Sequence, residues 1–295
     1  MSLGVLNNIA AVYAENNLNS TQSSLQNTLE QLSSGSRINS GADDAAGLSI
    51  ADGLGANSAA LTQSADNANQ GVGLLQVADG ALSQVTNLLN RAVTLSTEAS
   101  NGTLSASQDA AANQEFQSIL AEINNIGSTT TFNGNKVFSA TAVTVYSGDA
   151  TATGGATDAL DIATLTSASV GDVGGTISSA GTAISYTPGT GQKLSTDVLT
   201  SAAAAQTALT DVNTAITDIA AQRGYLGSQI NTLNAISSVD STEQENVLSA
   251  QNSIQATDYA QATSNLSKYE VLSQTGISAL AQANSVEQEV TKLLQ

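Results

Sequence analysis

Arg37, Asp43 and Asp44 come closest in this sequence to a set of residues with chemistry of their own. A guanidinium near two carboxylates could act as a charge relay, and the carboxylates could hold a calcium ion. The regular ligand spacing of a calcium loop is missing, however, and no nucleophile or base lies near in sequence. We therefore expect a structural ion pair that orders the link between two helices, of the exposed kind that contributes little energy.

The composition removes most catalytic chemistry. Histidine and cysteine are absent, so the chain can form no Ser-His-Asp triad, no thiolate nucleophile and no zinc site built on imidazole or sulfur. A metallopeptidase insert would need a His-Glu-x-x-His motif, which is also missing. We expect a protein that is not an enzyme and that has no cofactor and no metal site.

The charge balance limits the partners. The chain has 25 acidic and 7 basic residues, a formal net charge of −18, and its basic residues are scattered singly. Binding of nucleic acid needs clustered lysine and arginine, as does a polybasic membrane patch. No apolar run approaches membrane-spanning length, and the amino-terminal stretch lacks the basic start and apolar core of a cleaved secretory signal. We expect no nucleic acid and no membrane partner, and export, if it occurs, by a route other than the general secretory one.

Two long apolar stripes with three- and four-residue spacing organise the chain, and such spacing indicates long helices. The first stripe consists of Ile50, Leu54, Leu61, Ala68, Leu75, Ala78, Leu82, Val85, Leu89 and Ala92. The second consists of Val212, Ile216, Ile219, Leu226, Ile230 and Leu233 and, after a polar stretch, Val247 and Ile254. The first helix, over residues 42–100, would be about 90 Å long, whereas a compact chain of this length is about 50 Å across. The sequence therefore predicts a rod whose apolar ridges are too slender to be buried within one molecule.

Both ends of the chain also predict amphipathic helices, over about residues 3–33 and 259–294. Their apolar stripes are thin, and an isolated helix of this kind is marginal in water. We expect both ends to stay loose until neighbouring copies of the protein supply the missing contacts. We call these contacts between the terminal helices of neighbouring copies the inner contacts. The side chains expected in them are Leu25, Leu29, Leu32, Leu272, Val286, Val290 and Leu293.

The middle of the chain has a different composition. Asn133 and Gly134 supply the positive φ angles of a type I′ turn and predict a hairpin over residues 132–138. Residues 139–196 are mostly glycine, serine, threonine and alanine, with the only proline at Pro188. Short alternating pieces at 141–146 and 184–187 predict short strands, with a flexible linker as the alternative. The fold class is mainly α: a long coiled-coil-like helical rod formed by both chain ends, with a small β-rich central insert.

Specific stretches of the sequence resemble the bacterial flagellins. The strongest is residues 32–48, with the sequence LSSGSRINSGADDAAGL. Shorter matching stretches are residues 16–19, 80–82, 99–103, 132–134, 258–260 and 280–284. The resemblance covers about residues 3–138 and 197–295, which is most of the chain.

The resemblance implies a structural subunit that is exported through the flagellar type III apparatus and self-polymerises into the extracellular filament used for swimming. The implied partners are further copies of the chain, the flagellar cap, hook-junction proteins and an export chaperone. The implied domains are a terminal helical inner-tube domain (1–41 and 256–295), a long-helix rod domain with a hairpin (42–138 and 197–255) and a small β surface domain (139–196). A head-to-tail contact that does not close on itself would give the fibre.

Further residues are expected to serve self-assembly besides the inner contacts. In the long-helix bundle these are Leu75, Leu82, Val85, Leu89, Leu226, Ile230 and Leu233, and the link and helix surface add Arg37, Asp43, Asp44 and Arg91. Two alternatives stay open. One is the flagellar hook-filament junction protein, which has similar ends. The other is a secreted, adhesin-like surface-binding protein, although the scarcity of aromatic residues, chiefly Tyr146 and Tyr186, argues against a sugar-binding surface.

Overall fold

The computed structural model describes residues 8–139, 142–148, 157–160, 162–171, 176–180, 183–187 and 191–293. The chain forms two compact units. The terminal unit combines Met1–Gly55 with Asn246–Gln295, and the central unit is Ala56–Glu245. The division falls within two long helices, rather than at the link residues near 41 and 256 that the sequence suggested as boundaries.

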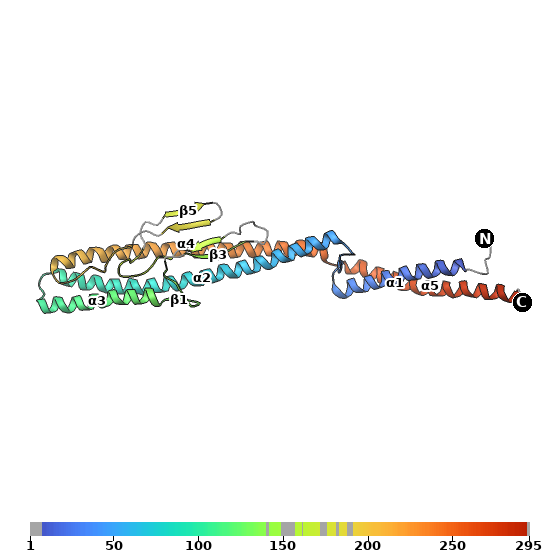
Figure 1. Cartoon of the computed structure of the whole chain (residues 1–295), viewed down its shortest axis with the longest axis horizontal. Helices are drawn as coiled ribbons and strands as arrows, with labels where there is room; N and C mark the ends of the chain where they lie inside the picture. Colours follow the sequence, from blue (N-terminus) through green and yellow to red (C-terminus); the bar gives the residue numbers. More distant parts are fainter. Residues whose placement is uncertain are drawn as a thin grey trace. The chain divides into compact units, whose positions relative to one another are not determined.

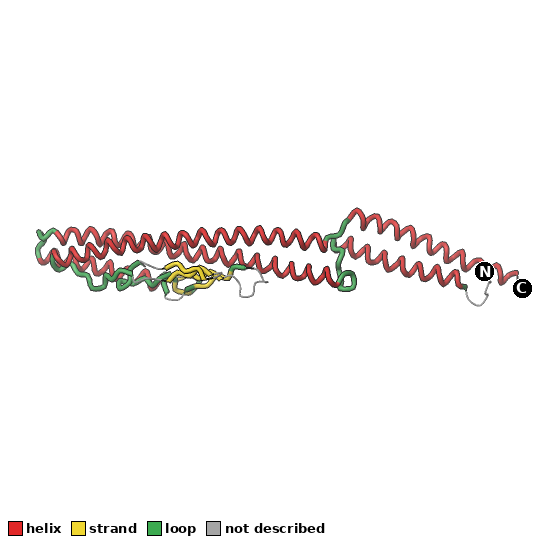
Figure 2. The backbone as a smooth tube through the Cα atoms, turned by 90° about the horizontal axis from the view of Figure 1, so that it is seen from above, coloured by secondary structure: helices red, strands yellow, loops and turns green. Residues whose placement is uncertain are grey.

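Helices dominate the described residues, as Figure 2 shows, and short strands occur only in the central unit. The helices are α1 (Ile9–Ser34), α2 (Ala45–Ser100), α3 (Ala106–Thr129), α4 (Ala202–Gln255) and α5 (Tyr259–Leu293), labelled in Figure 1. The strands are β1 (Thr131–Phe132), β2 (Asn135–Lys136), β3 (Val143–Tyr146), β4 (Thr157–Leu160), β5 (Thr176–Ala180) and β6 (Ala183–Thr187). The predicted helices are confirmed to within a few residues at the ends that are described.

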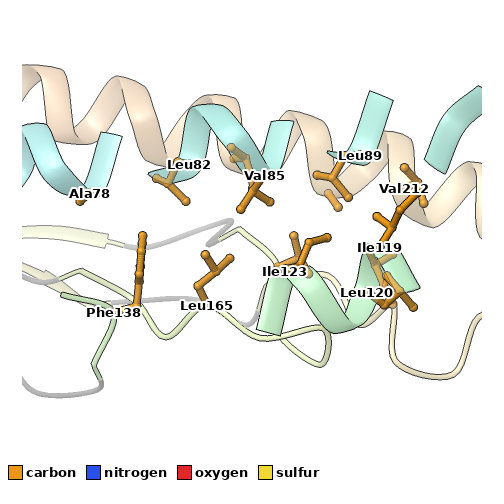
Figure 3. Packing of buried hydrophobic residues seen from close by; sticks show 14 of the residues in the cluster. Ala78, Leu82, Val85, Leu89, Ile119, Leu120, Ile123, Phe138, Leu165 and Val212 are labelled. Atoms are coloured by element: carbon orange, nitrogen blue, oxygen red, sulfur yellow. The ribbon is translucent and has the colours of Figure 1, made fainter. Parts of the chain in front are cut away.

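The core of the central unit lies where α2 meets α3 and α4. Leu82, Val85 and Leu89 of α2 point toward Ile119 and Ile123 of α3 (Figure 3). The side chains that complete this core from α3, α4 and the middle of the chain are Phe116, Leu120, Phe138, Leu160, Ile162, Leu165, Val170, Leu194, Leu199, Val212, Ile219, Leu226 and Leu233. From Leu61 to Ala92 and from Val212 to Leu233 the spacing read from the sequence marks the buried or half-buried side of α2 and α4, whereas Ile50, at the start of the first stripe, is 55% exposed.

The structure corrects one expectation about these stripes. Leu75, Leu82, Val85 and Leu89 are 0% exposed within the single chain. The ridge is not too slender for one molecule, because α3 and loop residues such as Leu165 cover it. The central unit thus completes its own core.

The polar stretch of α4, residues 237–244, does not interrupt the helix. Asp240 is buried and accepts a hydrogen bond from Ser64 Oγ at 2.5 Å. Gln244 Nε2 donates to Thr62 Oγ1 at 2.7 Å. The buried carboxylate of Asp240 thus has a polar partner on α2, as most buried polar groups do, and the bond of Gln244 lies at the surface.

A tight hairpin follows α3. β1 and β2 pair antiparallel with Phe132 opposite Asn135, which leaves Asn133 and Gly134 as the two turn residues. Their φ angles are +50° and +79°, the left-handed values that a type I′ turn requires at both positions. The hairpin prediction is confirmed.

The middle segment packs against the helices of the central unit. β3 pairs antiparallel with β4, and β5 with β6. A Cβ on Gly71 of α2 would lie 3.0 Å from Leu233 Cδ1 and 3.1 Å from Val145 Cγ2, so this helical glycine lets the strand and α4 approach closely. The strands predicted near 141–146 and 184–187 are confirmed by β3 and β6, and Pro188 lies outside the described residues.

In the terminal unit α1 and α5 lie side by side, as both views in Figures 1 and 2 show. Asn8 Nδ2 donates to the carbonyl of Ala283 at 3.0 Å, Leu18 lies against Gly276, and the residue after α1, Gly35, lies against Tyr259. The two helices are therefore antiparallel. Their contact is thin, because α1 has one buried side chain, Thr28, and the described part of α5 has one, Ala262.

Candidate assembly surface

Large apolar side chains are exposed on both helices of the terminal unit. On α1 they are Ile9, Val12, Tyr13 and Leu29, and on α5, besides Tyr259 whose hydroxyl lies against Gly35, they are Val271, Leu272, Ile277 and Val286, with exposed fractions from 43% to 68%. Isolated apolar residues on a surface are normal, but a group of this size on two adjacent helices marks an interaction site. We name these eight side chains the terminal apolar surface.

The terminal apolar surface is densest at one end of the helix pair. The hydrogen bond between Asn8 and Ala283 brings the start of α1 to the later part of α5. Ile9, Val12 and Tyr13 therefore lie at the same end as Ile277 and Val286. Covering the exposed part of each such side chain would contribute about 1 kcal/mol.

The sequence-predicted inner contacts fall into two classes. Leu25 and Leu32 are half-buried. They lie on the same face of α1 as Leu18 and Thr28, because successive members of this set are seven, three and four residues apart. Leu29, Leu272 and Val286 are exposed and belong to the terminal apolar surface. The side chains of Val290 and Leu293 lie outside the described residues, although the backbone of α5 is described to Leu293.

The link residues do not form the ion pair that the sequence suggested. Arg37 Nε donates to the carbonyl of Ile254 at 2.6 Å. The ion pairs within the described part of the chain are Arg91–Glu115 and Arg223–Asp79. The prediction was wrong because Arg37 finds a carbonyl in the last turn of α4, where helix carbonyls lack internal partners.

The two carboxylates of the link are used by the backbone instead. Asp43 Oδ2 accepts from the amides of Asn39 and Ser40 at 3.1 and 2.9 Å and from Ser40 Oγ, and these bonds lower the pKa of Asp43. Asp44 Oδ1 accepts from the amide of Gly47 at 2.8 Å and so caps the start of α2. The carboxylates shape the turn before α2, with no calcium-like arrangement.

Backbone hydrogen bonds join the two segments of the link, which are the segment between α1 and α2 and the segment between α4 and α5. Ser36 forms an antiparallel bridge with Ala256. The backbone amide of Arg37 donates to the carbonyl of Gln255 at 2.8 Å. The backbone amide of Thr257 donates to the carbonyl of Gly35 at 3.1 Å. Gly35 has φ +73° and lies against the Tyr259 hydroxyl, so the end of α1 needs glycine. The link therefore holds the start of α5 against the end of α1.

The long-helix residues predicted for assembly are internal. Leu226 and Leu233 are completely buried, and Ile230 is half-buried against the same core. Arg91 is exposed, and its Nε lies 2.7 Å from Glu115 Oε1, which lowers the pKa of Glu115. The three apolar residues therefore stabilise the core of the central unit, and Arg91 lies on its surface.

Sequence reasoning missed a buried carboxyl group that joins the middle segment to α4. Burial, the charge of Asp211 and a hydrogen bond with Asp211 raise the pKa of Asp197 to about 6. Gln117 Nε2 donates to the backbone carbonyl of Asp197 at 2.7 Å, which fixes this segment on α3. No local signal could have shown the pair, because its members come from different elements.

The described residues contain no group of three or more acidic side chains placed to hold a metal ion. Likewise, none of the described helices combines the length and the apolar character needed to span a bilayer.

Comparisons with known proteins agree with the geometry. Residues 5–143 match the bacterial flagellin N-terminal helical region, and residues 209–294 match the bacterial flagellin C-terminal helical region. The two regions contain α1, α2, α3, α5 and most of α4.

Several individual proteins are similar to this chain. Flagellin D of Vibrio cholerae is 28% identical over 377 aligned positions that cover 100% of both chains. Phase 1 flagellin of Salmonella naestved is 46% identical over 132 residues, 45% of this chain, which spans about a quarter (26%) of that protein. The crystal structure of Bacillus cereus flagellin matches with a TM-score of 0.45 and 24% sequence identity. The match covers 59% of this chain and 88% of that chain.

The matched regions include both chain ends that carry the terminal apolar surface and the self-contained helical core between them. Flagellins are structural proteins that self-assemble into filaments, which confirms the expectation of a filament subunit rather than an enzyme. From its two helical regions and its relatives, the chain belongs to the bacterial flagellin family.

Proposed function

We propose that the terminal apolar surface is the main contact by which copies of this chain join into the extracellular flagellar filament. The observation that carries this proposal is the contrast in burial between the two units. Leu82 and Val85 are completely covered within one copy, whereas Tyr13 and Ile9 are 68% and 65% exposed. Among the described residues, the terminal unit has eight large apolar side chains at least 43% exposed on two adjacent helices, whereas the helices of the central unit expose such side chains singly, as at Val239.

The finer roles follow from this assignment. The terminal helices would form the inner tube, the long helices of the central unit the layer around it, and the middle segment the outer surface. Export through the flagellar type III apparatus, with a chaperone covering the terminal apolar surface before assembly, suits helices that are marginal alone. The cap and the hook-junction proteins would meet the same surface at the two ends of the filament.

A pair of matched variants tests the main contact. Ile277→Asp places a charge in the terminal apolar surface, whereas Ser278→Asp places the same charge at a neighbouring exposed position of α5. Seeds of sheared wild-type filament would be added to each purified monomer. Ser278→Asp should elongate the seeds and Ile277→Asp should not, with equal helix content by circular dichroism. Elongation by Ile277→Asp at the wild-type rate would show that the contact lies elsewhere.

A trimmed chain separates a filament subunit from an adhesin-like protein. A deletion of residues 139–196 would remove buried core residues such as Leu165 and Leu194, so a smaller deletion is needed. Gly171 and Gly191 are adjacent, because a Cβ on Gly191 would overlap the carbonyl oxygen of Gly171. Joining these two glycines removes residues 172–190, including β6 where it contacts β4, and keeps the buried Leu165 and Leu194. A filament subunit should still polymerise after this deletion, whereas loss of polymerisation would assign the contact to the excised segment.

A further inference from the structure

The chain contains two Asn-Gly dipeptides, Asn101-Gly102 and Asn133-Gly134, which lie outside the terminal apolar surface. Asparagine is among the chemically labile residues of proteins. It is most labile before glycine, because the absence of a Cβ leaves the following backbone nitrogen open to the asparagine side chain. The two sites share this sequence but differ in structure.

Asn133 and Gly134 form the exposed tip of the β1–β2 hairpin. A Cβ on Gly134 would meet nothing within 4 Å, so the space around its nitrogen is open. Within the described part of the chain, no hydrogen bond holds the carboxamide of Asn133. The hairpin strands have two residues each, so few hydrogen bonds resist rotation of the backbone at the tip.

Asn101 follows the last residue of α2 and is also exposed. Its carboxamide Nδ2 donates to Thr103 Oγ1 at 3.1 Å, and its amide donates to the carbonyl of Glu98 at 3.3 Å. The bond from Nδ2 must break before the side chain can turn toward the nitrogen of Gly102. The structure therefore protects one Asn-Gly dipeptide and leaves the other free.

We propose that Asn133 is a site of spontaneous deamidation. The backbone nitrogen of Gly134, after losing its proton to hydroxide, attacks Asn133 Cγ and forms a bond to it. The bond from Cγ to Nδ2 then breaks, Nδ2 takes up a proton and leaves as ammonia, and a succinimide ring remains. Water opens the ring at either carbonyl, which gives aspartate or isoaspartate. The net reaction consumes one water and releases one ammonia.

The product changes the hairpin in two ways. A negative charge appears a few residues from Lys136, which is exposed and is the only basic residue of the hairpin. Isoaspartate also carries the chain through Cβ, so the two-residue turn gains a backbone atom and loses its type I′ geometry. The modification is irreversible and accumulates with the age of the subunit.

The full-length monomer is incubated at pH 7.5 and at pH 9 in heavy-oxygen water, and deamidation at both sites is measured by peptide mass spectrometry. Asn133 should react about fivefold faster than Asn101, which is the factor that the net free energy of one hydrogen bond supports. Both rates should rise with pH, because the attacking group is a deprotonated amide. In denaturant the ratio should fall to near one.

Thr103→Val removes the acceptor that holds Asn101 without touching the hairpin. This variant should raise the Asn101 rate toward that of Asn133. An Asn133 rate at or below that of Asn101 in the folded wild-type chain would overturn the proposal. So would an unreactive Asn133 in a chain that deamidates in denaturant. No polymerisation is needed, so the result does not depend on the assembly proposal.

Discussion

The terminal and central units bury their apolar stripes in different ways. In the central unit α3 and the middle segment cover the stripe of α2 completely. In the terminal unit α1 packs against α5, and five of the eight side chains of the terminal apolar surface keep more than half of their surface in water. Similar sequence patterns thus give a closed core where further elements cover the stripe, and exposed apolar side chains, our proposed assembly surface, where only a second helix covers it.

The sharpest test of this contrast uses two leucines. Leu82→Ala empties a fully buried position and should lower the free energy of unfolding of the central unit by about 3–5 kcal/mol. Leu29→Ala removes an exposed side chain of α1 and should change monomer stability by less than about 0.5 kcal/mol. Urea denaturation of both monomers gives the two values. Equal losses would show that the terminal helices also fold as a packed core.

A polar contact of the central unit gives the next effect in size. Asp240→Ala removes the acceptor of the Ser64 hydroxyl inside the interface of α4 with α2. The loss should be about 2 kcal/mol, as for a charge-assisted hydrogen bond whose partner stays buried. A double-mutant cycle with Ser64→Ala measures the coupling, and additive losses would contradict a direct interaction.

Replacing Asp197 should change the free energy of unfolding by a smaller amount. The change should be a gain in stability, and it should depend on pH. Its pKa is raised to about 6 from 3.8, so between these values the folded chain binds more protons than the unfolded chain. The stability of the central unit should therefore fall as pH rises from about 4 to about 6. After allowance for solvent screening we expect Asp197→Asn to stabilise the chain by about 1 kcal/mol at pH 7. Urea midpoints at pH 4 and pH 7 test this, and an unchanged pH slope in the variant would contradict it.

The exposed pair Arg91–Glu115 should give the smallest change. Both side chains remain about half in solvent, and exposed ion pairs of this kind contribute little. Arg91→Ala should leave the thermal unfolding midpoint of the monomer indistinguishable from that of the wild type, in low salt and in high salt. A clear, salt-sensitive loss would show that this pair is part of a larger network.

The sequence was sufficient for features that depend on near neighbours. Helix spacing predicted α2 and α4, and Asn133-Gly134 predicted the turn with its two positive φ angles. In each case the residues that decide the conformation lie within a few turns of helix or within the turn itself. The resemblance of residues 32–48 to flagellins also pointed to the correct family.

Features that join distant segments were not predictable in the same way. We expected Arg37 to pair with Asp43 or Asp44 because they are near in sequence, but it donates to the carbonyl of Ile254, which is 217 residues further along the chain. The cover over α2 comes from residues such as Leu165 and Leu194, which lie in a stretch that reads as a loop. Periodicity shows which face of a helix is apolar but not what will cover it.

The neighbouring glycines at 171 and 191 have a consequence for the evolution and engineering of the chain. The backbone departs from the core and returns to it at one point, where Val170 and Gln192 exchange two hydrogen bonds of 2.9 Å. Because closing a loop costs little more as the loop lengthens, this point can accept a peptide or a whole foreign domain. Each subunit would then display its cargo without a change in α1 and α5, the helices that we propose as the contact between subunits.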